Sequence, residues 1–191
     1  MVAATNVDLL GAEILPNPSQ VGIGGHQSPR SKNDEWLTPP HILQALGQFD
    51  LDPCAPAVRP WDMAHQHYSL IDNGLSRPWC GRVWLNPPYG PEVGRWLDRL
   101  ADHGRGTALV FARTETEWFS RVWREATALL FLAGRLTFFT VGGAPAPYNG
   151  GAPSVLCAFG EADARALRAS KLPGAFVALR GALAGPVEII E

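Results

Sequence analysis

The chain has 191 residues, of which 46% are hydrophobic and 18% charged, and its formal net charge is −2. This length predicts a single domain, and the composition excludes a disordered chain. The charge balance argues against a large basic surface for nucleic acid. Any contact with DNA or RNA must therefore come from locally clustered arginines.

The cysteines and histidines do not form a metal or disulfide pattern. Cys54, Cys80 and Cys157 are far apart and odd in number, which favours a reducing compartment. His65 and His67 have no third ligand nearby, so no metal site is predicted. With no signal peptide and no apolar run of roughly 18 residues, we expect a cytoplasmic protein without a membrane span.

The N-terminal region differs in composition from the rest. Residues 1–33 are rich in Gly, Pro, Ser, Asn and Gln, and show no apolar period after Leu15. We interpret this region as a flexible arm, in which Arg30 and Lys32 are candidates for contact with phosphate. A single folded domain is then expected over residues 34–191.

The folded region alternates between helical and extended patterns. Thr38 is a suitable N-cap and Pro39 a suitable first helical residue, which predicts a helix from Pro39 to Leu46 that Gly47 ends. The later expectations are strands at 49–52, 82–85, 108–112, 129–132 and 155–159, and helices at 93–100, 118–126 and 162–169. This alternation predicts an α/β fold with a mostly parallel sheet, an antiparallel last strand and helices on both faces.

Two of the expected strands end abruptly at polar residues followed by proline. Asp52 precedes Pro53, and Asn86 precedes Pro87 and Pro88. In parallel sheets ligands bind at the carboxyl ends of the strands. We therefore expect both endings to face one crevice that holds the chemistry.

The sequence Asn86-Pro87-Pro88-Tyr89 predicts a rigid shelf of hydrogen-bond acceptors. Each proline fixes its own φ angle, restricts the residue before it and lacks an N–H donor. The Asn86 side-chain oxygen and the Pro87 carbonyl can then accept both hydrogens of one amino group. Tyr89 lies where it can stack on a base, which contributes about 1–3 kcal/mol.

Such a shelf suits the exocyclic amine of adenine as a methyl acceptor. The nitrogen lone pair is delocalised into the ring, so the amine is a poor nucleophile. Two acceptors placed out of the ring plane draw the nitrogen toward tetrahedral geometry and free the lone pair for in-line attack on a methyl group. Fixed acceptors of this kind supply much of an enzyme's catalytic power.

Several blocks of the chain resemble the phage and prophage DNA N-6-adenine methyltransferases. The similarity covers roughly residues 24–160, including Gly25-His26-Gln27 in the arm. The blocks that carry it are Asp34 to Pro40, Phe49 to Ala55, Asp72 to Trp79, Asn86 to Gly90, Phe111 to Phe119 and Gly134 to Phe138.

This resemblance implies a Rossmann-like methyltransferase sheet, S-adenosylmethionine as cofactor and adenine in double-stranded DNA as substrate. It implies that the base is flipped out of the duplex, with Asn86, Pro87, Pro88 and Tyr89 as the catalytic loop. The cofactor residues that it implies are Trp36, Thr38, Pro39, Asp52, Pro53 and Asp72. The first cofactor loop departs from many methyltransferases, since it lacks the glycines that let a backbone approach a cofactor closely.

The DNA contacts are expected to come from loops beside the catalytic one. Arg113, Thr114 and Thr116 follow a predicted strand end on the crevice side, although Thr is also a favoured helix N-cap. Arg135 is a further candidate, and the alternative interpretation is a solvated surface arginine. Because the domain leaves little room for a separate recognition domain, we expect a short recognition sequence, read by residues 113–116 and 142–151.

Three other functions remain open on the sequence. An N4-cytosine methyltransferase uses the same amine chemistry, and a protein glutamine methyltransferase can hold a side-chain amide on the same shelf. A catalytically inactive module that binds cofactor or DNA is the third, and the intact Asn86 and Tyr89 argue against it. A C5-cytosine enzyme is set aside, because its nucleophilic cysteine would have to be Cys54, which lies at the predicted cofactor strand. The sequence does not determine the oligomeric state.

Overall fold

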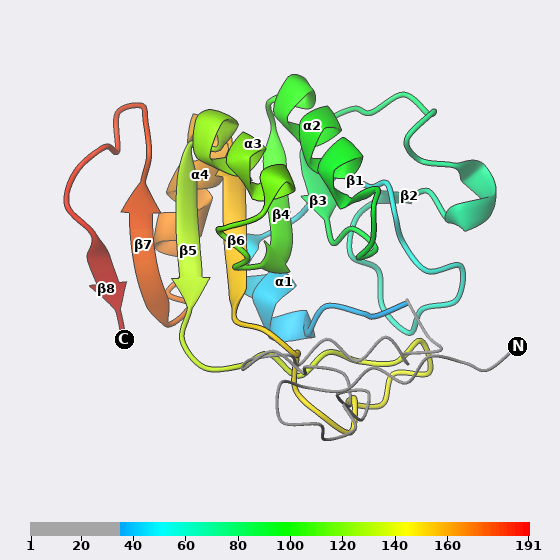
Figure 1. Cartoon of the computed structure of the whole chain (residues 1–191). Helices are drawn as coiled ribbons and strands as arrows, with labels where there is room; N and C mark the ends of the chain where they lie inside the picture. The colour runs from blue at the N-terminus through cyan, green and yellow to red at the C-terminus, as the bar shows by residue number, and fades with distance from the viewer. Residues whose placement is uncertain (1–34) are drawn as a thin grey trace, which may run out of the picture. The chain divides into compact units, whose positions relative to one another are not determined.

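The computed structural model describes residues 35–191, so the predictions for the arm at residues 1–33 lie outside the described residues. Its strands form a single sheet (Figure 1). They are β1 (Leu51–Asp52), β2 (Gln66–His67), β3 (Val83–Leu85), β4 (Gly106–Phe111), β5 (Ala128–Leu132), β6 (Ser154–Phe159), β7 (Gly174–Ala178) and β8 (Glu188–Ile190). The helices are α1 (Pro40–Leu46), the short 3-10 turn η1 (Leu70–Asp72), α2 (Val93–His103), α3 (Glu117–Glu125) and α4 (Glu161–Ala169).

The sheet is mixed, with the strand order β2-β1-β3-β4-β6-β5-β7-β8. Neighbours are parallel from β2 to β4, and every pair from β4 onward is antiparallel. The α/β class is therefore confirmed, but a mostly parallel sheet is wrong for its second half. The reason is the connection from β5 to β6, which is a loop at residues 133–153 instead of a crossover helix. β6 therefore runs back against β5 and occupies the place beside β4.

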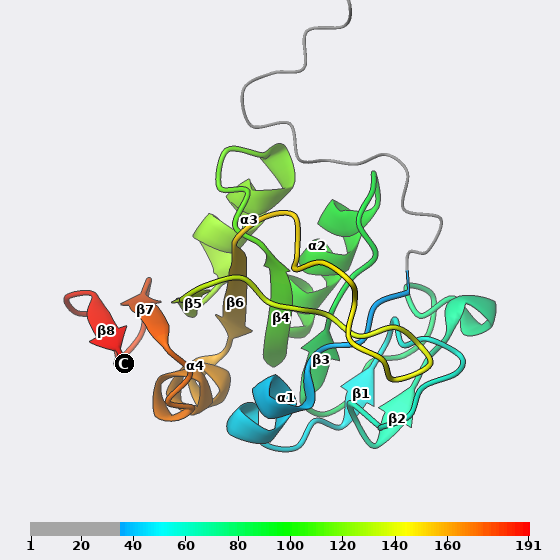
Figure 2. The ribbon, with the colours of Figure 1, turned by 90° about the horizontal axis from the view of Figure 1, so that it is seen from below.

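Helices cover both faces of the sheet, as predicted (Figures 1 and 2). On one face, α2 and α3 pack together over a core that contains Leu85 and Val110. On the other face, α1 and α4 cover a second core that contains Trp84 and Leu109. Adjacent residues of β3 and β4 thus alternate between two buried faces, which is why these strands are apolar throughout.

The first helix begins one residue later than the sequence predicts. Pro39 is the N-cap and Pro40 the first helical residue, while Gly47 ends the helix as expected. Thr38 is fully buried and does not cap the helix. The physical reason is the second proline, since a residue that precedes proline is held in an extended conformation.

A buried ion pair joins the start of β3 to helix α4. The Arg82 guanidinium donates to Asp163 Oδ1 at 2.7 Å, and Thr107 donates to the same oxygen at 3.1 Å. Arg82 also donates to the carbonyls of Leu46 and Gln48. The first two bonds pair Oδ1 of a completely buried carboxylate, while its Oδ2 has no hydrogen-bond partner among the described residues. Together the four bonds fix the edge of the sheet at which β3 begins. Among residues 35–191, no helix has the length and apolar character needed to cross a membrane.

Candidate active site

The carboxyl ends of β1, β3, β4 and β5 lie at one edge of the sheet, the lower edge in Figure 1. Asp52 is the last residue of β1, and Asn86 directly follows β3. The Cys54 thiol donates to the Asn86 main-chain carbonyl at 3.2 Å. The two strand endings therefore lie close together, while the crevice expected between them stays a prediction.

The orientation of the Asn86 side chain is set by a backbone carbonyl. Its Nδ2 donates to the Trp36 carbonyl at 3.1 Å. A carbonyl can only accept, so this contact assigns the nitrogen and oxygen of the amide without ambiguity. The Asn86 Oδ1 is the acceptor that this arrangement directs away from Trp36.

The two prolines of the loop differ in their surroundings. Pro87 is buried at the end of β3, while Pro88 is exposed. Within residues 35–191, no hydrogen bond is made to the Pro87 carbonyl. The loop therefore carries a second backbone acceptor to which no residue within 35–191 donates.

Tyr89 packs on Phe111, the last residue of β4. The two rings are stacked, with centroids 4.3 Å apart and an angle of 14° between their planes. The Phe111 N–H donates to the Tyr89 hydroxyl at 2.7 Å. Phe111 lies beyond the part of β4 that pairs with β3. Burial raises the pKa of the Tyr89 hydroxyl well above its ordinary value, so it remains protonated. The side chain is 41% exposed, and its exposed surface is available to a stacking partner.

Asp52 is a carboxyl group with little solvation. It is 2% exposed, and its Oδ1 accepts a hydrogen bond from the Cys54 N–H at 3.0 Å. Burial raises the pKa of Asp52 from 3.8 to about 7, although the Cys54 hydrogen bonds and Arg59 act in the opposite direction. Burial and the nearby Asp52 charge also raise the pKa of the Cys54 thiol, which argues against a thiolate nucleophile.

Of the other predicted cofactor residues, Trp36, Thr38 and Pro39 precede α1, and Pro53 follows β1. Thr38 is fully buried, and its hydroxyl has no hydrogen-bond partner among the described residues. Trp36 is half-buried, while Pro39 and Pro53 are buried. A buried hydroxyl without a hydrogen-bond partner lowers the stability of the fold, so the Thr38 hydroxyl is a candidate to bind a polar group of a ligand.

Asp72 has a structural task within its own turn. Its Oδ2 accepts hydrogen bonds from the Ser69 N–H at 2.8 Å and from the Ser69 hydroxyl at 2.7 Å. These bonds lower the pKa of the Asp72 carboxyl. A contact between Asp72 and a cofactor stays a prediction.

The predicted DNA residues follow β4 and β5. Thr116 is the N-cap residue of α3, and its hydroxyl donates to the Arg113 carbonyl at 2.7 Å instead of capping the helix. Thr114 is exposed and Arg113 half-buried. Arg135 is exposed and donates to the Gly150 carbonyl at 3.4 Å, across the base of the 133–153 loop. Their contacts with DNA stay predictions.

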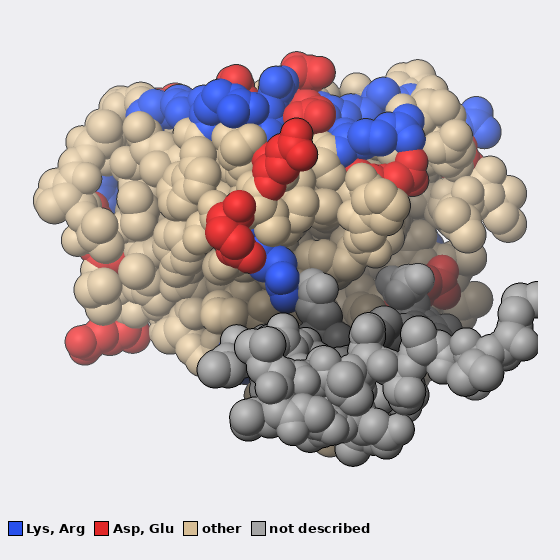
Figure 3. All heavy atoms as spheres, in the orientation of Figure 1, with Lys and Arg blue, Asp and Glu red and all other residues tan. Residues whose placement is uncertain are grey.

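Basic side chains are concentrated away from this edge. On the face shown in Figure 3, Lys and Arg gather along the opposite edge, over the ends of α2 and α3. Exposed arginines at that edge include Arg105, after α2, and Arg124, in the last turn of α3. Of the predicted DNA residues within 35–191, two are cationic, Arg113 and Arg135.

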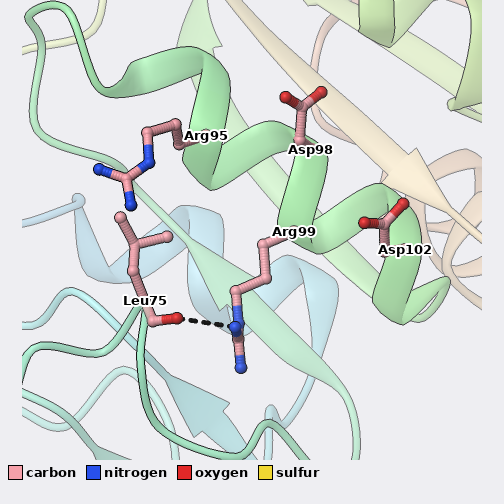
Figure 4. Close-up of a pocket in the computed structure, with 5 residues that line it drawn as sticks. All are labelled: Leu75, Arg95, Asp98, Arg99 and Asp102. Carbon is pink, nitrogen blue, oxygen red and sulfur yellow. Dashed lines mark hydrogen bonds between the residues drawn. The ribbon is translucent and has the colours of Figure 1, made fainter.

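A hollow on the surface of α2 is separate from the candidate site. It is lined by Leu75, Arg95, Asp98, Arg99 and Asp102 (Figure 4). Arg99 donates to the Leu75 carbonyl at 2.7 Å, so this guanidinium is already used to hold the segment between η1 and β3. None of the catalytic-loop residues lines the hollow.

Sequence reasoning missed two members of the site, Phe111 and the main-chain carbonyl of Trp36. Phe111 was recognisable as a large aromatic at the end of a buried strand, beside the catalytic strand. The Trp36 contact spans 50 residues of sequence, and no local pattern marks a backbone acceptor.

A sequence model of the family described as "DNA N-6-adenine-methyltransferase (Dam)" matches residues 25–168. The chain belongs to this family. This methyltransferase therefore methylates the N6 amine of adenine in DNA, which decides against the cytosine and glutamine alternatives. A methyltransferase of this family implies S-adenosylmethionine as the methyl donor. Neither the curated proteins nor the solved structures contain a match to the chain.

Proposed function

We propose that Asn86, Pro87, Pro88 and Tyr89 form the loop that holds a flipped adenine of double-stranded DNA during methyl transfer. The Asn86 Oδ1 and the Pro87 carbonyl accept the two hydrogens of the N6 amine. The observation that carries this proposal is the Asn86–Trp36 hydrogen bond, because it turns the amide oxygen into a fixed acceptor before the substrate arrives. Preorganised acceptors cost no reorganisation at the moment of reaction.

Tyr89 forms the stacking surface for the base in this proposal. Phe111 supports one side of the Tyr89 ring and binds its hydroxyl, so the exposed side remains for adenine. Stacking on a rigid ring returns part of the few kcal/mol that base flipping costs. The hydroxyl is already bonded and need not contact the base.

The cofactor is proposed to lie in a Rossmann-like arrangement at the ends of β1 and β3. Asp52 and Thr38 fit this group, since one offers a buried carboxyl oxygen and the other a buried hydroxyl without a partner. Trp36, Pro39 and Pro53 are the apolar neighbours, and Asp72 is a more distant candidate. S-adenosylmethionine supplies the electrophilic methyl group, and these residues bind and orient it.

No strong base is required in the protein for this reaction. The amine proton becomes acidic once the nitrogen carries the methyl group, and the acceptors of the shelf hold it until water removes it. The protonated Cys54 donates to the Asn86 main-chain carbonyl and so acts as part of the scaffold. Arg113, Thr114, Thr116 and Arg135 are proposed to contact the DNA beside the extruded base.

The test is methyl transfer by an Asn86→Ala variant. Loss of one fixed acceptor is expected to reduce kcat by roughly a hundredfold to a thousandfold, with little change in cofactor affinity. The assay measures labelled methyl incorporation into adenine-only DNA, with cytosine-only DNA and a peptide as specificity controls. Gln44→Ala removes an exposed amide on α1 and is expected to have wild-type activity. Near-normal turnover by Asn86→Ala would end the shelf mechanism.

A further inference from the structure

The loop between β5 and β6, residues 133–153, has an ordered inner side that faces the candidate site. The Gly150 N–H donates to the Leu136 carbonyl at 2.6 Å, and the Ala146 N–H donates to the Phe138 carbonyl at 2.8 Å. Phe138 is buried and Phe139 half-buried. Because the loop forms these internal bonds, a displacement of one part is transmitted to the rest.

The first connection from this loop leads to Asn86. The Leu37 N–H donates to the Phe139 carbonyl at 2.8 Å, and the Phe139 N–H donates to the Leu37 carbonyl at 3.0 Å. The carbonyl of the preceding residue, Trp36, accepts the hydrogen bond from the Asn86 amide. The position of Phe139 therefore affects the carbonyl that orients the catalytic amide.

The second connection leads to Tyr89. A β-carbon added at Gly150 would lie 3.3 Å from the rings of both Phe111 and Phe138. The loop backbone thus rests directly against the Phe111 ring, and that ring stacks on Tyr89. The absence of a side chain at Gly150 is what permits this approach.

The outer side of the same loop is available to a partner. Tyr148 is 83% exposed, and its neighbours Pro147 and Asn149 are exposed as well. The segment Pro147-Tyr148-Asn149 contains an exposed aromatic ring and an amide but no basic residue. Such a segment suits contact with nucleobases better than contact with phosphates. The partner chemistry is therefore that of a DNA base edge or base face.

We propose that duplex DNA binds the outer side of the 133–153 loop and, through its inner side, holds both catalytic groups in the alignment that they already have. Gly150 and Phe139 are positioning residues in this scheme, acting through Phe111 and Leu37. The inference rests on the proposed catalytic roles of Asn86 and Tyr89. It couples contact with DNA to retention of the alignment that Trp36 and Phe111 provide.

The test is a graded pair of substitutions at Gly150 with matched controls at Gly185, which lies between β7 and β8 outside the 133–153 loop. Neither glycine has a positive φ, so added side chains cause no backbone strain at either position. At Gly185 the nearest atom to an added β-carbon is the Leu183 carbonyl oxygen at 3.8 Å. The full-length protein, labelled S-adenosylmethionine and unmethylated plasmid DNA are used throughout, and kcat, the KM for DNA and Tm are measured.

We expect kcat to fall roughly tenfold in Gly150→Ala and roughly a hundredfold in Gly150→Val, because small displacements of reacting groups cost this much. The KM for DNA and Tm should remain near wild-type, and Gly185→Ala and Gly185→Val should have kcat within about twofold of wild-type. The inference is overturned if the two series have the same kcat, or if the losses at Gly150 are accompanied by a matching fall in Tm. Asn86→Ala in the same assay separates the two proposals, since activity in that variant rejects the proposed function itself.

Discussion

Asn86 and Asp52 show how single buried contacts prepare this site for its ligands. Asn86 has its amide orientation fixed by Trp36, which leaves an oxygen acceptor for the substrate. The Asp52 Oδ1 accepts a hydrogen bond from the Cys54 N–H, and burial raises the pKa of Asp52 to about 7. The Asn86 amide is thus oriented before a ligand binds, whereas the Asp52 carboxylate needs a cation or a hydrogen-bond donor to stabilise its charge.

The raised pKa of Asp52 predicts how cofactor affinity depends on pH. Below about pH 7 the free enzyme holds this carboxyl in its neutral form, which cannot attract the ammonium group of the cofactor. Affinity should therefore fall by roughly tenfold between pH 8 and pH 6. Calorimetric titration with S-adenosylhomocysteine at several pH values measures this. A similar pH dependence in Asp52→Asn would show that another group is responsible.

The same carboxyl also predicts a pH effect on stability. The folded pKa lies above the unfolded value of 3.8, so the native state holds the proton more tightly, and stability falls as pH rises from about 4 through about 7. Asp52→Asn removes the cost of ionisation at high pH. We expect a Tm increase of roughly 4–8 °C at pH 8, equivalent to about 2 kcal/mol, and no increase at pH 4. Thermal unfolding at both pH values is the measurement, and an equal change at both would contradict this account.

At the scale of elements, the first cofactor loop is supported by the segment after η1. A β-carbon on Gly74 would lie 1.8 Å from the Pro53 carbonyl oxygen. The absence of a side chain at Gly74 therefore lets the backbone of this segment approach the Pro53 carbonyl closely. This contact explains how a loop of Pro53, Cys54 and Ala55 can remain close to β2.

Gly74→Ala is accordingly expected to displace the loop that carries Asp52. The overlap is with backbone and cannot be relieved by rotation of a side chain, so we predict a loss of stability of about 1–3 kcal/mol and weaker cofactor binding. Gly94→Ala in α2 is the matched control, since its nearest contact is 3.4 Å and alanine favours a helix. Chemical denaturation of both variants tests this, and equal stability would contradict it.

The sequence was informative where apolar patterns repeat and uninformative where contacts are distant. The stripe of Val93, Trp96, Leu97 and Leu100 on α2 is buried as predicted, since helical periodicity follows directly from burial of one face. β7 and β8 were not predicted, because β7 is short and only partly buried. The order of β5 and β6 depends on which strand fits beside β4, which no single segment encodes. For the same reason, the strand-end positions of Asp52 and Asn86 were predictable, but the Trp36 carbonyl that accepts from the Asn86 amide was not.

On the scale of the whole molecule, a group of exposed arginines lies at the edge of the sheet opposite the candidate site. The positive edge shown in Figure 3 lies where α2 and α3 end, whereas the catalytic loop follows β3 at the other edge. Of the proposed DNA residues, only Arg113 and Arg135 are cationic. Recognition should therefore depend more on bases and stacking than on the phosphate backbone.

This distribution predicts a weak salt dependence of DNA binding. Two to four phosphate contacts correspond to a slope of roughly −2 to −4 in a plot of log K against log salt concentration. Fluorescence anisotropy with a labelled duplex between 50 and 200 mM salt measures it. Replacing Arg113 and Arg135 by Gln should reduce the slope, while Arg105 and Arg124, replaced in the same way, serve as the control pair. A slope steeper than about −6 would require a larger basic interface.

The most direct test of the account is a crystal structure of the enzyme with duplex DNA and an unreactive cofactor analogue. The shelf mechanism predicts that the adenine N6 lies about 2.7–3.2 Å from both the Asn86 Oδ1 and the Pro87 carbonyl oxygen. The base should be stacked on Tyr89, and the Asn86 amide should still be bonded to the Trp36 carbonyl. An adenine bound elsewhere, or an Asn86 side chain turned away from its amino group, would contradict the shelf mechanism.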